Sequence, residues 1–181
     1  MLILESRIMQ TGFPRADARD DFDRARRQAR WAKLAAWLSG QPSGANRLKL
    51  LGEVTIVAGA GAAMAGGLRP RPEHAGSLAQ ARQAAVPIDT IVGSVEPTMS
   101  FDRHFRPTSQ VPRDRFQQIA ISLRRGRGMD PVELYHYGGE YYVLDGHHRI
   151  AVARALGERS VWAMITEVRP VGPARTAGER R

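Results

Sequence analysis

Cysteine is absent from this chain of 181 residues. Its absence excludes disulfide bonds, thiolate catalysis and zinc sites with cysteine ligands. Long hydrophobic runs are absent too: the longest apolar stretch, residues 54–67, is rich in glycine and alanine and shorter than the about 20 residues that a membrane span requires. Residues 1–5 include an acid and lead into no long apolar core, unlike a secretory signal. We therefore expect a soluble, cytoplasmic protein with no membrane partner.

Lysine is scarce, and acidic residues are too few to balance the arginines. Only Lys33 and Lys49 are lysines, and 27 basic residues face 18 acidic ones, for a formal net charge of +9. Basic proteins favour polyanions such as nucleic acids, nucleotides or anionic lipid surfaces. The alternative is that an arginine- and alanine-rich composition reflects a GC-rich genome, and composition alone leaves both open.

Composition divides the chain into four parts. We predict a basic helical segment over 1–58, a linker rich in Gly, Ala, Pro and Arg over 59–85, an organised domain over 86–168 and a disordered tail over 169–181. The length suits one compact domain with additional segments.

Within the organised domain, turn residues separate short periodic segments. Gly138 and Gly139 indicate a hairpin turn, and Gly157 ends a helix. The predicted elements are a strand at 87–92, a helix opened by Pro112, hairpin strands at 132–137 and 141–144, a helix at 148–156 and a strand at 161–168. This order predicts an α+β fold with a small mixed sheet, preceded by a helical N-terminal segment.

The N-terminal segment contains a strongly basic helix, predicted over 16–38. Trp31, Leu34, Ala35 and Leu38 follow the spacing of one apolar helical stripe. Four arginines precede that stripe, namely Arg24, Arg26, Arg27 and Arg30. They are candidates for contact with DNA phosphates; the alternative is the solvated face of an amphipathic helix. Residues 46–57 suit either a short helix or a strand.

The most informative segment, residues 143–150, reads as a strand, a one-turn corner and a helix start. A helix N-terminus carries unpaired N–H groups and the positive end of the dipole, so it attracts anions. Gly146 permits a positive φ and leaves room for a ligand to approach the backbone. Arg149 can hold a phosphate through two hydrogen bonds, and the rings of His147 and His148 add hydrogen-bonding and titratable groups.

The same corner contains groups suited to proton transfer. Asp145 can act as a base, orient an imidazole or hold a cation, and His148 can exchange a proton near neutral pH. Adjacent histidines point in different directions, so we predict no zinc site. The alternative interpretation is an ordinary Asp-Gly turn followed by solvated helix residues, since short motifs often occur by chance.

Residues 142–157 resemble the second conserved box of the ParB/sulfiredoxin superfamily. Gly146, Arg149 and Ala153 match the Gly-Glu-Arg-Arg box of ParB proteins, with His147 and His148 in place of the acid and the first arginine. Gly146, His148 and Arg149 match the Gly-Cys-His-Arg box of sulfiredoxins. His147 replaces the essential cysteine, which argues against sulfinic acid reductase activity. The Asp-Gly-His pattern also resembles the nucleotide-dependent kinase branch that acts on a free amino acid.

The resemblance covers about half the chain and implies a ligand. Family members bind the phosphates of ATP, ADP or CTP at the start of the box-two helix, and Mg²⁺ can accompany them. In such a fold the basic loop 101–107 lies near the corner, where Arg103 and Arg106 reach phosphates and Asp102 or His104 serves a metal or substrate. The alternative is a charged surface loop with packed phenylalanines.

Three functions follow from these observations. The first is a ParB-like, nucleotide- or phosphate-binding regulatory protein that works on or near DNA. The second is a small phosphotransferase or a nuclease-like phosphohydrolase that uses Asp145, His148 and Arg149. The third is an interaction protein that kept the fold without the chemistry. The sequence leaves the nucleotide, the reaction and the number of subunits open.

Overall fold

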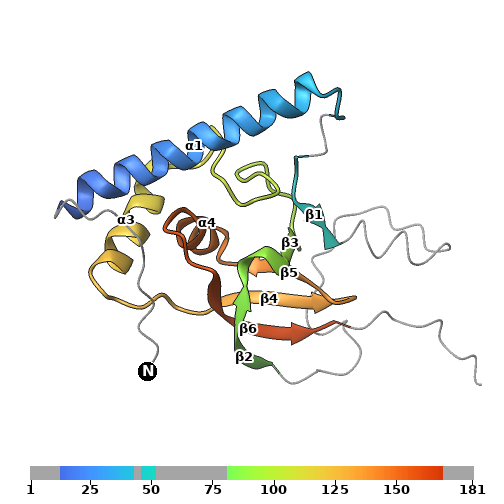
Figure 1. The fold of residues 1–181 in the computed structure, drawn as a ribbon. Coiled ribbons are helices and arrows are strands. Elements are labelled where there is room, and N and C mark those ends of the chain that lie inside the picture. Colours follow the sequence, from blue (N-terminus) through green and yellow to red (C-terminus); the bar gives the residue numbers. More distant parts are fainter. Residues whose placement is uncertain (1–12, 43–45, 52–80, 169–181) are drawn as a thin grey trace, which may run out of the picture.

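The computed structural model describes residues 13–42, 46–51 and 81–168 (Figure 1). The helices and strands of this part, in chain order, are α1 (Pro14–Leu38), β1 (Lys49–Leu50), β2 (Arg82–Pro87), the 3₁₀ helix η2 (Ile88–Thr90), β3 (Ile91–Ser94), α3 (Arg113–Arg124), β4 (Val132–Tyr137), β5 (Glu140–Asp145), α4 (His147–Ala155) and β6 (Ser160–Glu167). The predicted combination of helices with one mixed sheet is confirmed, and a helix precedes the sheet as expected.

The six strands lie in the order β1-β3-β5-β4-β6-β2. Strands β4 and β5 form the predicted antiparallel hairpin, and Gly138 and Gly139 adopt positive φ at its turn. Strand β3 runs parallel to β5, strand β4 parallel to β6, and β2 antiparallel to β6.

The strand predicted over 87–92 is interrupted by η2, and this interruption has a topological role. Strand β2 lies at one edge of the sheet, whereas β3 lies four strand positions away. A flat sheet would separate them by about 19 Å, at about 4.8 Å per strand, which exceeds the ~14 Å that four residues can span. The sheet must therefore curl so that its two ends approach each other.

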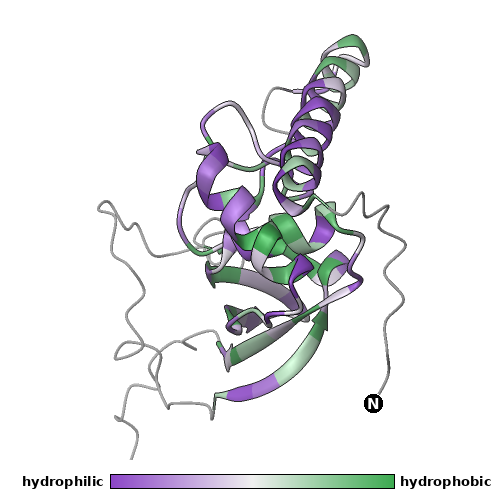
Figure 2. Ribbon diagram, turned by 90° about the vertical axis from the view of Figure 1, so that its left-hand side faces the viewer, coloured by the Kyte–Doolittle hydropathy of each residue, from purple (hydrophilic) through white to green (hydrophobic). Residues whose placement is uncertain are grey.

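The main core lies between the sheet and the three helices, with α4 in the middle (Figures 1 and 2). Residues Ile150, Ala151, Val152 and Ala153 of α4 are all buried. A smaller cluster on the other face of the sheet is built around Tyr135, Tyr137 and Tyr142. Helix α4 is thus anchored in the main core, and the second cluster packs the opposite face of the sheet.

Helix α1 buries a different face from the one that carries its apolar stripe. Ala18, Phe22, Ala25 and Ala29 are buried, and Phe22 packs edge-to-face on Phe116 of α3 with 5.2 Å between ring centroids.

The predicted apolar stripe lies instead in the second half of α1, which projects beyond the other elements (Figure 2). Trp31 is 68% exposed, Leu34 42% and Leu38 70%. The stripe exists as predicted but is exposed, because α1 packs on α3 through residues of its first half such as Phe22.

The sheet extends beyond the predicted boundaries of the organised domain. Strand β1 comes from the segment predicted as 1–58 and pairs with β3, and β2 begins at Arg82, inside the range predicted as a linker. Most of that linker and the tail at 169–181 lie outside the described residues. None of the helices described has both the length and the apolar composition needed to cross a membrane.

Candidate functional site

The corner between β5 and α4 lies where the sequence predicted it. Strand β5 ends at Asp145, Gly146 occupies the N-cap position, and α4 begins at His147. No side chain within the described part of the chain caps this helix. Its first N–H groups, which have no acceptor within the helix, are therefore free to meet an anion.

Gly146 is required by both conformation and space. Its φ is +106°, a backbone conformation that residues with a Cβ atom rarely adopt. A Cβ atom here would lie 2.7 Å from Cγ1 of Val132. The missing side chain thus allows β4 to approach the corner closely.

The ring of His147 points toward the sheet. Its Nε2 lies 2.8 Å from Oγ of the buried Ser94 on β3, and its plane is nearly parallel to Phe101 with 6.0 Å between centroids. Burial lowers the pKa of His147 to about 4, so the ring is neutral at physiological pH. In this position His147 orients the corner, and its backbone N–H remains available to a ligand.

The ring of His148 lies edge-on to Phe101, with 5.1 Å between centroids. Its Nε2 atom is buried and has no hydrogen-bond partner within the described residues. Burial, followed by the positive charge of Arg115, lowers the pKa of His148, while Asp145 acts in the opposite direction. His148 is therefore a neutral ring with one unsatisfied nitrogen beside an arginine.

Arg149 is occupied by contacts within the protein. One terminal nitrogen donates to the carbonyl oxygens of Asp130, at 2.9 Å, and Pro131, at 2.6 Å. The other forms an ion pair with the carboxylate of Asp145. Arg149 thereby links the corner to the residues that precede β4. To bind phosphate, as the sequence predicted, Arg149 would have to release some of these contacts.

A cavity of about 460 Å³ opens at the corner. Its lining comes from α3, the following loop and the β5–α4 corner: Arg115, Gln118, Ile119, Asp130, Asp145, Gly146, His147, His148 and Arg149. Arg115 forms no ion pair within the part of the chain described. It is thus a free cation on the wall opposite the uncapped helix.

Arg115 was not among the residues predicted for the site. It lies 30 positions before Asp145 and reaches the corner only because α3 packs on α4. The sequence shows only that Arg115 lies in the first turn of the helix opened by Pro112. It does not show which other segment this arginine faces.

Loop 101–107 does lie against the corner, through its phenylalanines. Phe101 contacts both histidine rings, and the Phe105 ring lies 6.3 Å from that of His147. Arg103 and Arg106 are not among the residues that line the corner cavity.

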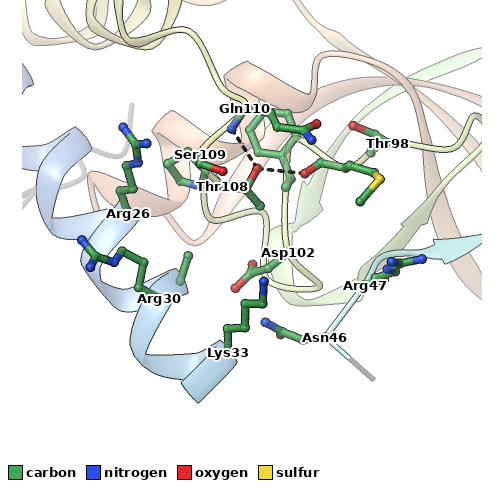
Figure 3. A pocket seen from close by; sticks show the side chains of 14 residues that line it. Arg26, Arg30, Lys33, Asn46, Arg47, Thr98, Asp102, Thr108, Ser109 and Gln110 are labelled. Carbon is green, nitrogen blue, oxygen red and sulfur yellow. Dashed lines mark hydrogen bonds between the residues drawn. The ribbon is translucent and has the colours of Figure 1, made fainter. Parts of the chain in front are cut away.

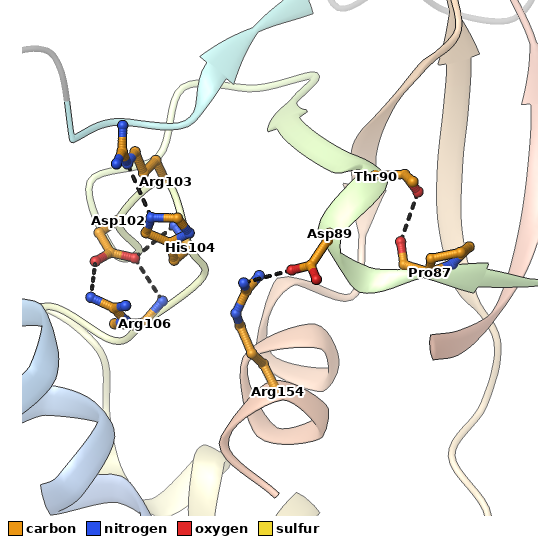
Figure 4. A network of polar contacts seen from close by, with 8 residues as sticks. All are labelled: Pro87, Asp89, Thr90, Asp102, Arg103, His104, Arg106 and Arg154. Carbon is orange, nitrogen blue, oxygen red and sulfur yellow. Dashed lines mark hydrogen bonds and ion pairs between the residues drawn. The ribbon is translucent and has the colours of Figure 1, made fainter. Parts of the chain in front are cut away.

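A polar network holds these two arginines elsewhere (Figure 4). Oδ1 of the buried Asp102 accepts from the backbone N–H groups of His104 and Arg106, at 2.9 Å each. Nε of Arg103 donates to Nε2 of His104 at 3.1 Å. Arg106 lies 3.8 Å from the second oxygen of Asp102. The loop is thus a rigid turn whose arginines line other cavities.

The four candidate DNA-binding arginines separate into different environments. Arg24 pairs with Asp21 at 3.6 Å. Arg26 and Arg30 line a cavity between α1 and residues 98–110, while Arg27 borders an open surface hollow that it shares with Arg30. The described residues contain no cluster of three or more carboxylate or histidine side chains able to hold a metal.

Comparisons with known proteins leave the family open. No family model matches this chain, and no curated protein matches it. Among solved structures, sulfiredoxin from Arabidopsis thaliana is similar to it, with 20% identity and a TM-score of 0.38 over 48% of this chain and 85% of that one. A similarity this low decides neither the fold family nor the function.

Proposed function

We propose that the β5–α4 corner binds a phosphate-bearing ligand, a nucleotide such as ATP, ADP or CTP with Mg²⁺, and that the protein acts as a nucleotide-responsive regulator. The observation that carries this proposal is the cavity of about 460 Å³ between the uncapped start of α4 and the unpaired Arg115. Its volume lies within the roughly 300–1,000 Å³ of small-molecule sites. Helix N–H groups on one wall and a guanidinium on the other suit an anionic oxygen group.

The role of each residue follows from its contacts. The N–H groups of the first turn of α4 donate to the phosphate, Arg115 supplies the opposing charge, and His148 lines the cavity beside them. Arg149 and Asp145 act as positioning residues through their mutual ion pair. The matching residues Gly146, Arg149 and Ala153 support a second part of the proposal, that this chain is a divergent relative of ParB-like domains.

A catalytic role is the second candidate, and the environment of His148 favours it. A neutral imidazole with an unpartnered nitrogen can accept a proton at physiological pH, and Asp145 is close enough to influence its pKa. In this alternative His148 is the base of a small phosphotransferase or phosphohydrolase.

Thermal unfolding with inorganic phosphate, ATP, ADP and CTP, each with and without Mg²⁺, tests the binding proposal. A ligand that binds only the folded protein stabilises it by about 2.7 kcal/mol when present at 100 times its Kd, so the Tm must rise. Replacing the exposed Arg115 by glutamine removes a charge-assisted hydrogen bond, and we expect Kd to increase about tenfold or more.

Arg127→Gln is the matched control, because Arg127 is exposed just after the same helix and does not line the cavity. If both variants weaken ligand binding equally, the ligand is attracted by the general positive charge of the protein and not by this site. If no ligand raises the Tm, the proposal is refuted. For the catalytic alternative, His148→Gln should abolish release of phosphate or nucleoside diphosphate while binding persists. Unchanged turnover would exclude His148 as the base.

A further inference from the structure

A second basic surface, suited to anions, lies along loop 98–110 and α1. Arg26, Arg30 and Lys33 lie at positions i, i+4 and i+7 of α1 and therefore share one helix face. They form one wall of a cavity of about 590 Å³, and the loop forms the other wall. Figure 3 shows these side chains along the helix edge, opposite Thr98 and Gln110.

The cavity has an excess of free positive charge. Arg26, Arg30, Lys33 and Arg47 line it, and none of the four forms an ion pair within the residues described. The acidic side chain in the lining, Asp102, is 4% exposed and holds the loop turn with Oδ1. The loop wall is therefore fixed, and the four cations in the lining outnumber its one carboxylate.

The same surface continues along α1 into an aromatic region. Trp37 follows Lys33 by one turn and lies at i+11 from Arg26, on the same face. Arg30 and Lys33 also border an open surface hollow between side chains of α1 alone, together with Arg27, Trp31, Leu34 and Trp37. Trp31 is 68% exposed and Trp37 73%. Because the cavity and this hollow share Arg30 and Lys33, they form one continuous surface.

We propose that this surface binds single-stranded nucleic acid, with phosphates on Arg26, Arg30 and Lys33 and bases stacked on Trp31 and Trp37. Proteins that bind single strands combine a basic groove with exposed aromatic rings, because every base has a face that stacks. Unpaired cations match the phosphate charges, and the two tryptophans account for exposed apolar area on a projecting helix. Helices that lie on membranes separate their cations from their apolar face, whereas here the exposed Trp37 lies on the same face as Arg30 and Lys33.

The length of the surface sets the size of the ligand. The eleven helical steps from Arg26 to Trp37 span about 16 Å at ~1.5 Å per residue. At ~3.4 Å per stacked nucleotide, this corresponds to about four or five nucleotides. No residue proposed for this surface lines the corner cavity, so each proposal stands or fails without the other.

Fluorescence anisotropy with a labelled oligothymidylate of about 12 nucleotides, within the range of ~4–16 per binding unit, tests the electrostatic part. We expect log K to fall with log salt by about 0.7 for each phosphate neutralised on a single strand. The double variant Arg30→Gln/Lys33→Gln should reduce that slope by about 1.4. Arg127→Gln should leave it unchanged.

Tryptophan fluorescence tests the stacking part. In a Trp162→Phe background the emission comes from Trp31 and Trp37 alone, and we expect the oligonucleotide to quench it. Trp37→Ala should weaken binding about fivefold or more, the lower limit for a base stacked on an aromatic ring. Trp162→Ala is the matched control, because Trp162 is a 52% exposed tryptophan on β6.

Three results would overturn the proposal: no quenching, equal or tighter binding of a duplex of the same length, or unchanged affinity in Trp37→Ala. Because the substituted side chains are exposed, we expect these variants to retain the wild-type Tm, and circular dichroism checks it. A duplex preference would indicate an ordinary DNA-binding helix. Binding lost equally in all variants would indicate general attraction to a basic protein.

Discussion

The attachment of α1 to the rest of the protein depends on a buried charge cluster. Arg124, in the last turn of α3, faces Asp17 and Asp21 of α1, and all three side chains are 4–6% exposed. Arg124 pairs directly with Asp21, and one of its terminal nitrogens lies 3.9 Å from Asp17. Removing one partner of a buried ion pair costs about 3–5 kcal/mol, because the remaining charge stays buried without compensation.

We therefore expect Arg124→Met to lower the free energy of unfolding by at least about 3 kcal/mol, a large part of the ~5–15 kcal/mol of an ordinary domain. Urea denaturation followed by circular dichroism measures this loss. The control is Arg113→Met, because Arg113 also joins α3 to α1, through a 2.7 Å contact with Asp23, but both side chains are more than a third exposed. An exposed pair contributes only about 0–1 kcal/mol.

A third variant tests whether Arg124→Met destabilises the protein because the ion pairs are lost or because the two aspartates remain buried without a positive partner. Replacing Arg124, Asp17 and Asp21 together by apolar residues should recover most of the stability, because a buried charge cluster often contributes no more than an apolar replacement. If Arg124→Met costs no more than Arg113→Met, the cluster does not hold α1 in place and the reasoning fails.

Two further predictions concern the corner. The pKa of His147 falls from 6.5 in the unfolded chain to about 4 in the folded protein. The unfolded state therefore binds more protons between these values, and stability should decline as the pH falls from about 6.5 to 4, by at most ~1.4 kcal/mol per pH unit. His147→Asn should flatten this part of the profile in urea titrations at several pH values, and an unchanged slope would contradict it. Gly146→Ala should destabilise more than Gly139→Ala: both have positive φ, but only at Gly146 would a Cβ atom meet Val132, at 2.7 Å. Equal losses of unfolding free energy would show that close packing at Gly146 adds nothing.

Local features of the fold were predictable because a few neighbouring residues encode them. Gly138 and Gly139 specify the hairpin turn, since a two-residue turn of this kind needs positive φ at both positions. The corner at Gly146 and the start of the following helix were likewise predictable from turn chemistry. The interruption at residues 88–90 was not, because it depends on the sheet curling to join β2 to β3.

The sequence by itself determined the turns, the extents of most helices and strands, the excess of positive charge and the position of the β5–α4 corner. Only the tertiary structure decided which side chains face that corner: it brought Arg115 in from α3, turned His147 toward Ser94 and engaged Arg149 with Asp145. It also left the apolar stripe of α1 exposed. The physical reason is that periodicity and turn chemistry act over a few residues, whereas burial and charge pairing depend on segments far apart in the chain.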